Sequence, residues 1–76
     1  MNPELVILNA LQPCYPRGLR PDALNATLRI GGNSMSLTDQ DRHCRNLEAK
    51  GQATIVKGQD YSLIKITPDG LARLAE

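Results

Sequence analysis

Apolar residues recur at helical spacing in the first half of the chain. Residues 3–12 are predicted to form a helix, because Asn2 is a favourable N-cap and Pro3 suits the first helical position. Pro13 and Pro16 bar further helical turns, so the helix is expected to end before them. Its predicted core face consists of Leu5, Ile7, Leu8 and Leu11.

A second helix is expected after a turn of the chain at Arg17 and Gly18. Pro21 and Asp22 open this helix, and the glycine pair at 31–32 closes it. Its apolar stripe is predicted from Ala23, Leu24, Thr27 and Leu28, with Ile30 as a candidate further member.

Residues 36–50 carry the clearest helical pattern of the chain. Ser36 or Thr38 can cap this third helix, and Gly51 is expected to end it. Acidic residues come early and basic residues late, which is the order that the helix dipole favours. These charged residues are Asp39, Asp41, Arg42, Arg45 and Lys50.

One side of the third helix is predicted to enter the core. Successive side chains are about 100° apart on a helical wheel, so Leu37, Cys44 and Leu47 define the buried side. Arg42 and Asn46 are four residues apart and therefore face away from the core together. The outward polar face is what remains once the apolar side is buried.

The pattern then changes to that of a β-hairpin. Residues 53–57 and 60–67 are rich in β-branched side chains, and positions 58–59 between them are interpreted as a two-residue loop. Ile64 and Ile66 alternate onto one face of the second strand. The sequence therefore predicts a two-stranded ribbon directly after the third helix.

A short last helix is expected at the end of the sequence. Thr67 can cap it, Pro68 suits its first position, and Leu71 and Leu74 are expected to point inward. The order is helix, helix, helix, hairpin, short helix. This order indicates a single α+β domain over residues 1–76, with helices and ribbon sharing one core.

The composition limits both the core and the charge. Hydrophobic residues make up 41% of the 76 positions, with no Phe or Trp, so the core must be aliphatic. Nine basic and eight acidic residues leave a formal charge of +1, so no strong overall field attracts nucleic acid. Any surface that binds nucleic acid must therefore be local.

Residues with catalytic or metal-binding chemistry are not grouped in the sequence. Cys14 and Cys44 lack a C-x-x-C spacing, and His43 has no second histidine to complete a metal set. Cys44 is interpreted as a buried free thiol. We expect no enzyme activity, no catalytic residue, no metal and no cofactor. The N-terminal stretch lacks the features of a signal peptide and is too short to span a membrane, which indicates a cytoplasmic protein without a membrane partner.

Two short motifs resemble those of a known family. The stretch NLEAKGQATIVKG and the following YSLIKITPDGLARL are similar to winged helix-turn-helix domains of bacterial MarR and PadR regulators. Those families carry Leu-Glu-x-x-Gly at the end of the recognition helix and Leu-Thr-x-x-Gly after the second wing strand. Residues 47–51 and 66–70 match these motifs. The resemblance implies a small winged-helix domain of bacterial or phage-like origin: three helices, a β-hairpin wing and a short C-terminal helix.

The resemblance also implies binding to double-stranded DNA, as a transcriptional regulator or an accessory protein of a mobile element. Arginine suits guanine and asparagine suits adenine in the major groove, which directs attention to Arg42 and Asn46. The expected DNA-binding residues are Ser36, Thr38, Arg42, Arg45, Asn46, Lys50, Lys57, Gln59 and Lys65.

An alternative function stays open at this point. A polar helix face is often only a solvated surface, and the near-neutral charge and early acids Asp39 and Asp41 weaken a DNA-binding interpretation. Leu63 beside Tyr61 predicts a small apolar patch on the hairpin. The alternative is a winged-helix module that binds a protein partner or forms a homodimer, without nucleic acid.

Overall fold

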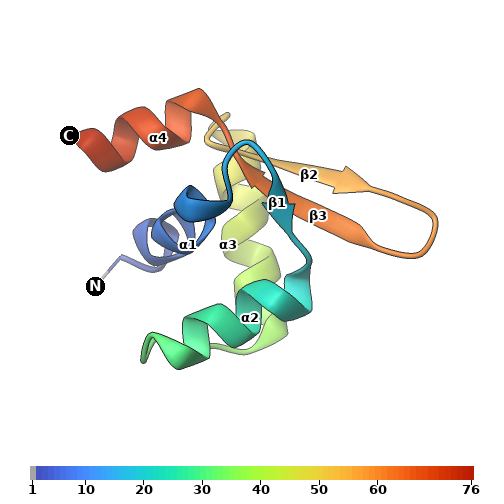
Figure 1. Ribbon diagram of the computed structural model, residues 1–76. Helices are drawn as coiled ribbons and strands as arrows, with labels where there is room; N and C mark the ends of the chain where they lie inside the picture. The colour runs from blue at the N-terminus through green and yellow to red at the C-terminus, as the bar shows by residue number, and fades with distance from the viewer. Residues whose placement is uncertain (1) are drawn as a thin grey trace.

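The structure is a computed structural model that describes residues 2–76. The helices pack together, and a β-hairpin projects to one side, beyond them (Figure 1). This is the predicted α+β arrangement. The elements in chain order are α1 (Pro3–Leu11), the 3-10 helix η1 (Gln12–Cys14), β1 (Gly18–Leu19), α2 (Pro21–Ile30), α3 (Leu37–Ala49), β2 (Ala53–Lys57), β3 (Ser62–Ile66) and α4 (Pro68–Ala75).

Side-chain caps begin three of the helices, as the sequence predicts. The Asn2 side chain accepts from the Glu4 N–H group at 2.9 Å at the start of α1. Ser36, rather than Thr38, caps α3 by accepting from the Asp39 N–H group at 3.1 Å. Thr67 caps α4 in the same way. None of the helices formed by residues 2–76 has the length and apolar character that a membrane crossing requires.

The sheet contains a strand that the sequence pattern does not reveal. The strands run antiparallel in the order β1-β3-β2, and β1 pairs Gly18 with Lys65. The predicted turn at Arg17 and Gly18 is therefore wrong at its second residue. Two residues carry no periodic signal, so only pairing with β3 identifies β1. A Cβ atom on Gly18 would lie 2.6 Å from the carbonyl oxygen of Ile64, so glycine permits this close pairing.

The hairpin loop is longer than predicted. Lys57 pairs with Ser62, which leaves residues 58–61 in the loop instead of two residues. The Gly58 N–H group donates to the Tyr61 carbonyl oxygen at 2.7 Å and closes it. Tyr61 thus belongs to the loop and not to the strand.

The core is aliphatic, as the composition predicts. Its buried members are Ile7, Leu8, Leu11, Leu24, Leu28, Cys44, Leu47, Ala53, Ile64 and Ile66, with Leu5, Leu71 and Leu74 packed at its edge. Four predicted core positions are wrong: Leu37 is 57% exposed, Ile30 is 88% exposed, and Ala23 and Thr27 are also exposed. Leu37 is the first residue of α3 and lies outside the core. Gln40, about one turn further along the helix, is buried instead.

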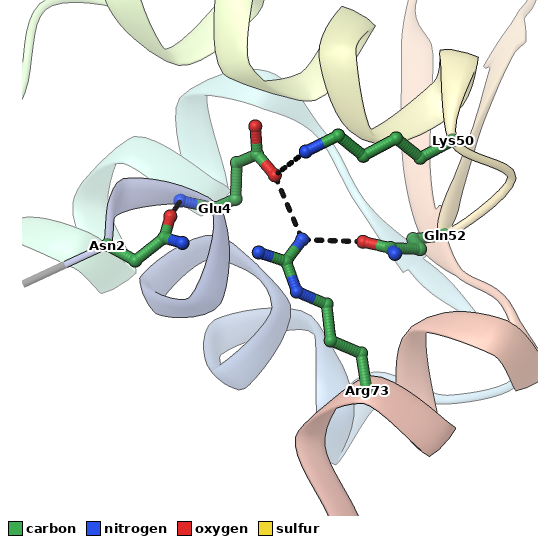
Figure 2. Close-up of polar contacts among 5 residues, drawn as sticks. All are labelled: Asn2, Glu4, Lys50, Gln52 and Arg73. Carbon is green, nitrogen blue, oxygen red and sulfur yellow. Dashed lines mark hydrogen bonds and ion pairs between the residues drawn. The ribbon is translucent and has the colours of Figure 1, made fainter. Parts of the chain in front are cut away.

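An ionic cluster fastens the two ends of the chain to the end of α3 (Figure 2). Glu4 on α1 accepts from Lys50 Nζ at 2.7 Å and from Arg73 Nη1 at 2.9 Å. Arg73 on α4 also donates to Gln52 Oε1 at 2.6 Å. Hydrogen bonds from Lys50, and then from Arg73, lower the pKa of Glu4 below its ordinary value. The cluster holds α1, α3 and α4 in one arrangement.

Candidate nucleic-acid interface

Two amide side chains fix α3 against α2. Gln40 is buried and donates from Nε2 to the Pro21 carbonyl oxygen at 2.9 Å. Its Oε1 accepts from Asn25 Nδ2 at 3.1 Å, and the same Asn25 amide donates to the Met35 carbonyl oxygen at 2.9 Å. These bonds tie α2, the connector and α3 together, and they set the direction in which α3 presents its outer face.

The sequence interpretation missed both residues of this pair. Gln40 precedes Cys44 by four positions and Leu47 by seven, so helical periodicity already places it on the buried side. The local pattern thus carries a signal for Gln40, but a buried side defined by apolar residues alone does not include it. Asn25 has no comparable local signal, because its partners lie 10 and 15 positions away.

The outer face of α3 carries the polar residues that the sequence places there. Arg42, Arg45 and Asn46 are all exposed, and they lie on the helix whose opposite side is buried through Gln40, Cys44 and Leu47. Ser36 and Thr38 are exposed at its N-terminal end. The helix therefore offers arginine and amide groups to a ligand without disturbing the core.

Each arginine on this face has an acidic partner on the same helix. Arg42 Nη2 lies 3.2 Å from Asp39 Oδ1, and Arg45 Nε lies 2.9 Å from Asp41 Oδ2. All four side chains are more than half exposed, so these pairs contribute little to stability. They do cancel charge on the face, and a phosphate approaching it meets two carboxylates as well as two guanidinium groups.

A groove separates α3 from the hairpin. It has a volume of about 360 Å³ and is lined by Asp41, Arg45, Glu48, Ile55, Lys57 and Ser62. The Ile55 N–H group on the outer edge of β2 donates to Glu48 Oε2 at 3.3 Å, so part of the groove wall is held by α3 itself. Arg45 and Lys57, from two separate elements, are brought together here.

The other hairpin and helix-end residues of the predicted site are dispersed. Gln59 is exposed in the loop, and Lys65 is half-buried on the sheet face opposite Ile64. Lys50 points toward α1, where its ammonium group contacts Glu4 (Figure 2). The structure thus gathers the α3 residues and Lys57, and it separates them from Lys50 and Lys65.

The cysteines do not form a chemical site. Burial, and then the nearby charge of Asp41, raises the pKa of the Cys44 thiol to about 11, so the thiolate is disfavoured at neutral pH. Across residues 2–76, no three His, Cys, Asp or Glu side chains come together in a way that could hold a metal ion.

The arrangement is similar to that of a DNA-binding protein of known structure. BpsR of Bordetella bronchiseptica, whose DNA binding is regulated by 6-hydroxynicotinic acid, matches with a TM-score of 0.79 at 17% sequence identity. The match covers 95% of this chain and 47% of that chain, so the chain spans about half the length of BpsR. No protein-family model matches, and no curated protein is similar in sequence. The helices, three-stranded sheet and projecting hairpin form a small winged-helix domain.

Proposed function

We propose that the chain is a DNA-binding winged-helix module, in which α3 enters the major groove and the β2–β3 hairpin lies beside it as a wing. One observation carries this proposal. Arg42 and Asn46 are exposed on the outer face of a helix that Gln40, Cys44 and Leu47 hold in place from behind. A major-groove helix requires such side chains on a rigid support.

The similarity to BpsR supports the proposal, because that protein binds DNA under the control of a small molecule. At 17% identity the likeness concerns the fold, so DNA binding by this chain rests on its own residues. A role in transcription regulation is the form of the function that we propose.

The structure suggests a division of roles within the proposed interface. Arg42 and Asn46 read base edges, as the matching of arginine to guanine and asparagine to adenine allows. Ser36 and Thr38 donate hydroxyl groups to phosphate at the start of α3. The flanking contacts come from Arg45, Lys57 and Gln59. Lys50 is not part of this set, because its side chain is turned toward α1, where its ammonium group contacts Glu4.

A salt series with a fluorescent duplex of mixed sequence tests the proposal. Wild type is expected to bind at low ionic strength and to weaken steeply as salt rises. Arg42→Ala is expected to reduce affinity. Arg29→Gln, which removes an equal charge from the exposed end of α2, is the matched control and is expected to bind like wild type. A wild-type protein that shows no salt-dependent binding rules the function out.

A second function is favoured by one specific observation. Two large apolar side chains near the α2–α3 connector, Ile30 and Leu37, are exposed where a core position was predicted. Such side chains are typical of a surface that meets another protein. In this case the module binds a protein partner or a second copy of itself. Light scattering over a range of concentrations tests self-association, and a Leu37→Ser variant that stays monomeric where wild type dimerises would support it.

A further inference from the structure

Several basic residues have no acidic partner in the described part of the chain, and three of them belong to one region of the sheet. Among residues 2–76, acidic groups pair with Arg42, Arg45, Lys50 and Arg73. Arg17, Arg20 and Lys65 have no carboxylate within ion-pair distance in the same part of the chain, and all three lie around the β1–β3 pair. Lys57, beside the α3 groove, and Arg29, near the end of α2, are likewise unpaired among these residues, so the β1–β3 region carries three of the five unpaired basic residues.

Strand pairing brings Arg20 and Lys65 toward one face of the sheet, because side chains two positions apart along an extended chain point the same way. Gly18 pairs with Lys65, and Arg17 and Arg20 stand immediately before and after β1. A Cβ atom on Gly18 would lie 2.8 Å from Cγ of Lys65, so the stem of Lys65 crosses β1 at the position where a side chain is missing. The aliphatic stem of Lys65 thus lies over the strand that Arg17 and Arg20 flank.

The wing loop holds one member of this group in place. The guanidinium carbon of Arg20 lies 4.7 Å from the centre of the Tyr61 ring. A guanidinium group stacked on an aromatic ring keeps its N–H edges free for a phosphate. Tyr61 is itself half exposed, so the pair lies at the protein surface. Arg20 is therefore presented to solvent in a restrained position next to the hairpin.

We propose that Arg17, Arg20 and Lys65 form a second phosphate-binding surface, which contacts the sugar-phosphate backbone of duplex DNA beside the contacts made by α3 and the wing. The inference rests on the proposed function and adds Arg17 and Arg20 to the interface. Charge complementarity selects the occupant, because these cations meet a polyanion without first giving up an ion pair. The arginines of α3 must share theirs with Asp39 and Asp41.

The salt dependence of binding tests this surface, because log K falls with log salt, and each phosphate contact that is lost makes this slope shallower by about 0.9. The probe is the same mixed-sequence duplex, and each variant is first checked for its circular dichroism and melting transition. We expect the double variant Arg17→Gln/Arg20→Gln to show a shallower slope, which corresponds to about two fewer phosphate contacts. Arg29→Gln, which removes a charge at the far end of α2, should keep the wild-type slope.

Substitutions of Tyr61 give a second test, because they leave the net charge of the protein unchanged. Tyr61→Phe keeps an aromatic face under Arg20 and should bind like wild type. Tyr61→Leu removes that face without changing charge and should weaken binding in the same direction as Arg20→Gln. Equal binding by the leucine and phenylalanine variants would show that the ring does not position Arg20.

The outcomes separate this inference from the proposed function. Absence of salt-dependent binding in wild type overturns both. Weaker binding in Arg42→Ala, together with an unchanged slope in Arg17→Gln/Arg20→Gln, overturns the second surface alone. A shallower slope in the double variant with wild-type binding in Arg42→Ala supports the second surface and counts against the role of α3.

Discussion

The side-chain amide of Asn25 on α2 donates a 3.1 Å hydrogen bond to Oε1 of Gln40 on α3. Gln40 is almost fully buried and also donates to the Pro21 carbonyl oxygen. A buried amide is stabilising only while its partners are present, because an unpaired polar group inside a protein is costly. The pair therefore makes the angle between α2 and α3 specific, in addition to joining the helices.

Gln40→Met tests this relationship. Methionine fills a similar volume but leaves Asn25 Nδ2 and the Pro21 carbonyl oxygen with fewer partners, so we expect a loss of about 1–3 kcal/mol in the free energy of unfolding. Chemical denaturation measures it. Asn25→Ala and the double variant complete a cycle, in which the two losses should not be additive. Additive losses would mean that the two amides act independently.

The Glu4 cluster predicts a pH dependence of stability. The pKa of Glu4 is lower in the folded protein than its ordinary value of 4.5, chiefly through the hydrogen bond from Lys50. The unfolded chain therefore binds the proton more readily, so the stabilisation is complete above about pH 4.5 and is lost as pH falls through the folded-state pKa. Glu4→Gln should lower stability at neutral pH by about 1–2 kcal/mol and flatten this acid limb. If the free energy of unfolding depends on pH in the same way in wild type and Glu4→Gln, Glu4 is not the source of the acid dependence.

Removing the acids of α3 is expected to strengthen DNA binding. Asp41→Asn frees Arg45, and Asp39→Asn frees Arg42, while both reduce repulsion of phosphate. Exposed pairs of this kind contribute about 0–1 kcal/mol, so the fold should be little affected. We expect tighter binding of several-fold in an anisotropy titration at low salt. Asp69→Asn, on the first turn of α4, is the control for a change in overall charge.

Gly70 is a helical position where alanine should destabilise. Helix propensity alone favours Gly→Ala by about 1 kcal/mol. A Cβ atom on Gly70 would, however, overlap the Gln52 carbonyl oxygen and lie 2.8 Å from Cγ1 of Ile66. Overpacking of this kind costs about 1–3 kcal/mol, so the steric effect dominates. Thermal unfolding of Gly70→Ala should show a lower melting temperature. The reverse change at exposed Ala72 on the same helix, Ala72→Gly, reports the ordinary propensity cost.

The two thiols should differ in reactivity. Cys44 is fully buried and its pKa is raised to about 11, whereas Cys14 is only half-buried. In a native titration with a thiol-reactive dye, Cys14 should react first, and Cys44 should react only as the protein unfolds. Cys14→Ser should abolish the fast phase. Rapid labelling that persists in this variant would show that α3 opens locally.

Local sequence signals determined the elements of this protein. Asn2, Ser36 and Thr67 each bond a backbone N–H group within three positions, so their effect on helix starts is visible without the fold. The periodic placement of Cys44, Leu47, Ile64 and Ile66 likewise identified the buried sides of α3 and β3. These signals act within a few residues and do not depend on how the elements meet.

Only the tertiary structure decided how those elements meet. The Arg73–Glu4 bond joins positions 69 apart, and β1 exists only because β3 lies beside it. The same packing buried Gln40, left Leu37 exposed and turned Lys50 toward Glu4, although the local pattern indicated otherwise. Whether a side chain at these positions is buried, exposed or paired depends on which surface a neighbouring element covers. That depends on the placement of whole helices and strands, which helical or strand periodicity does not specify.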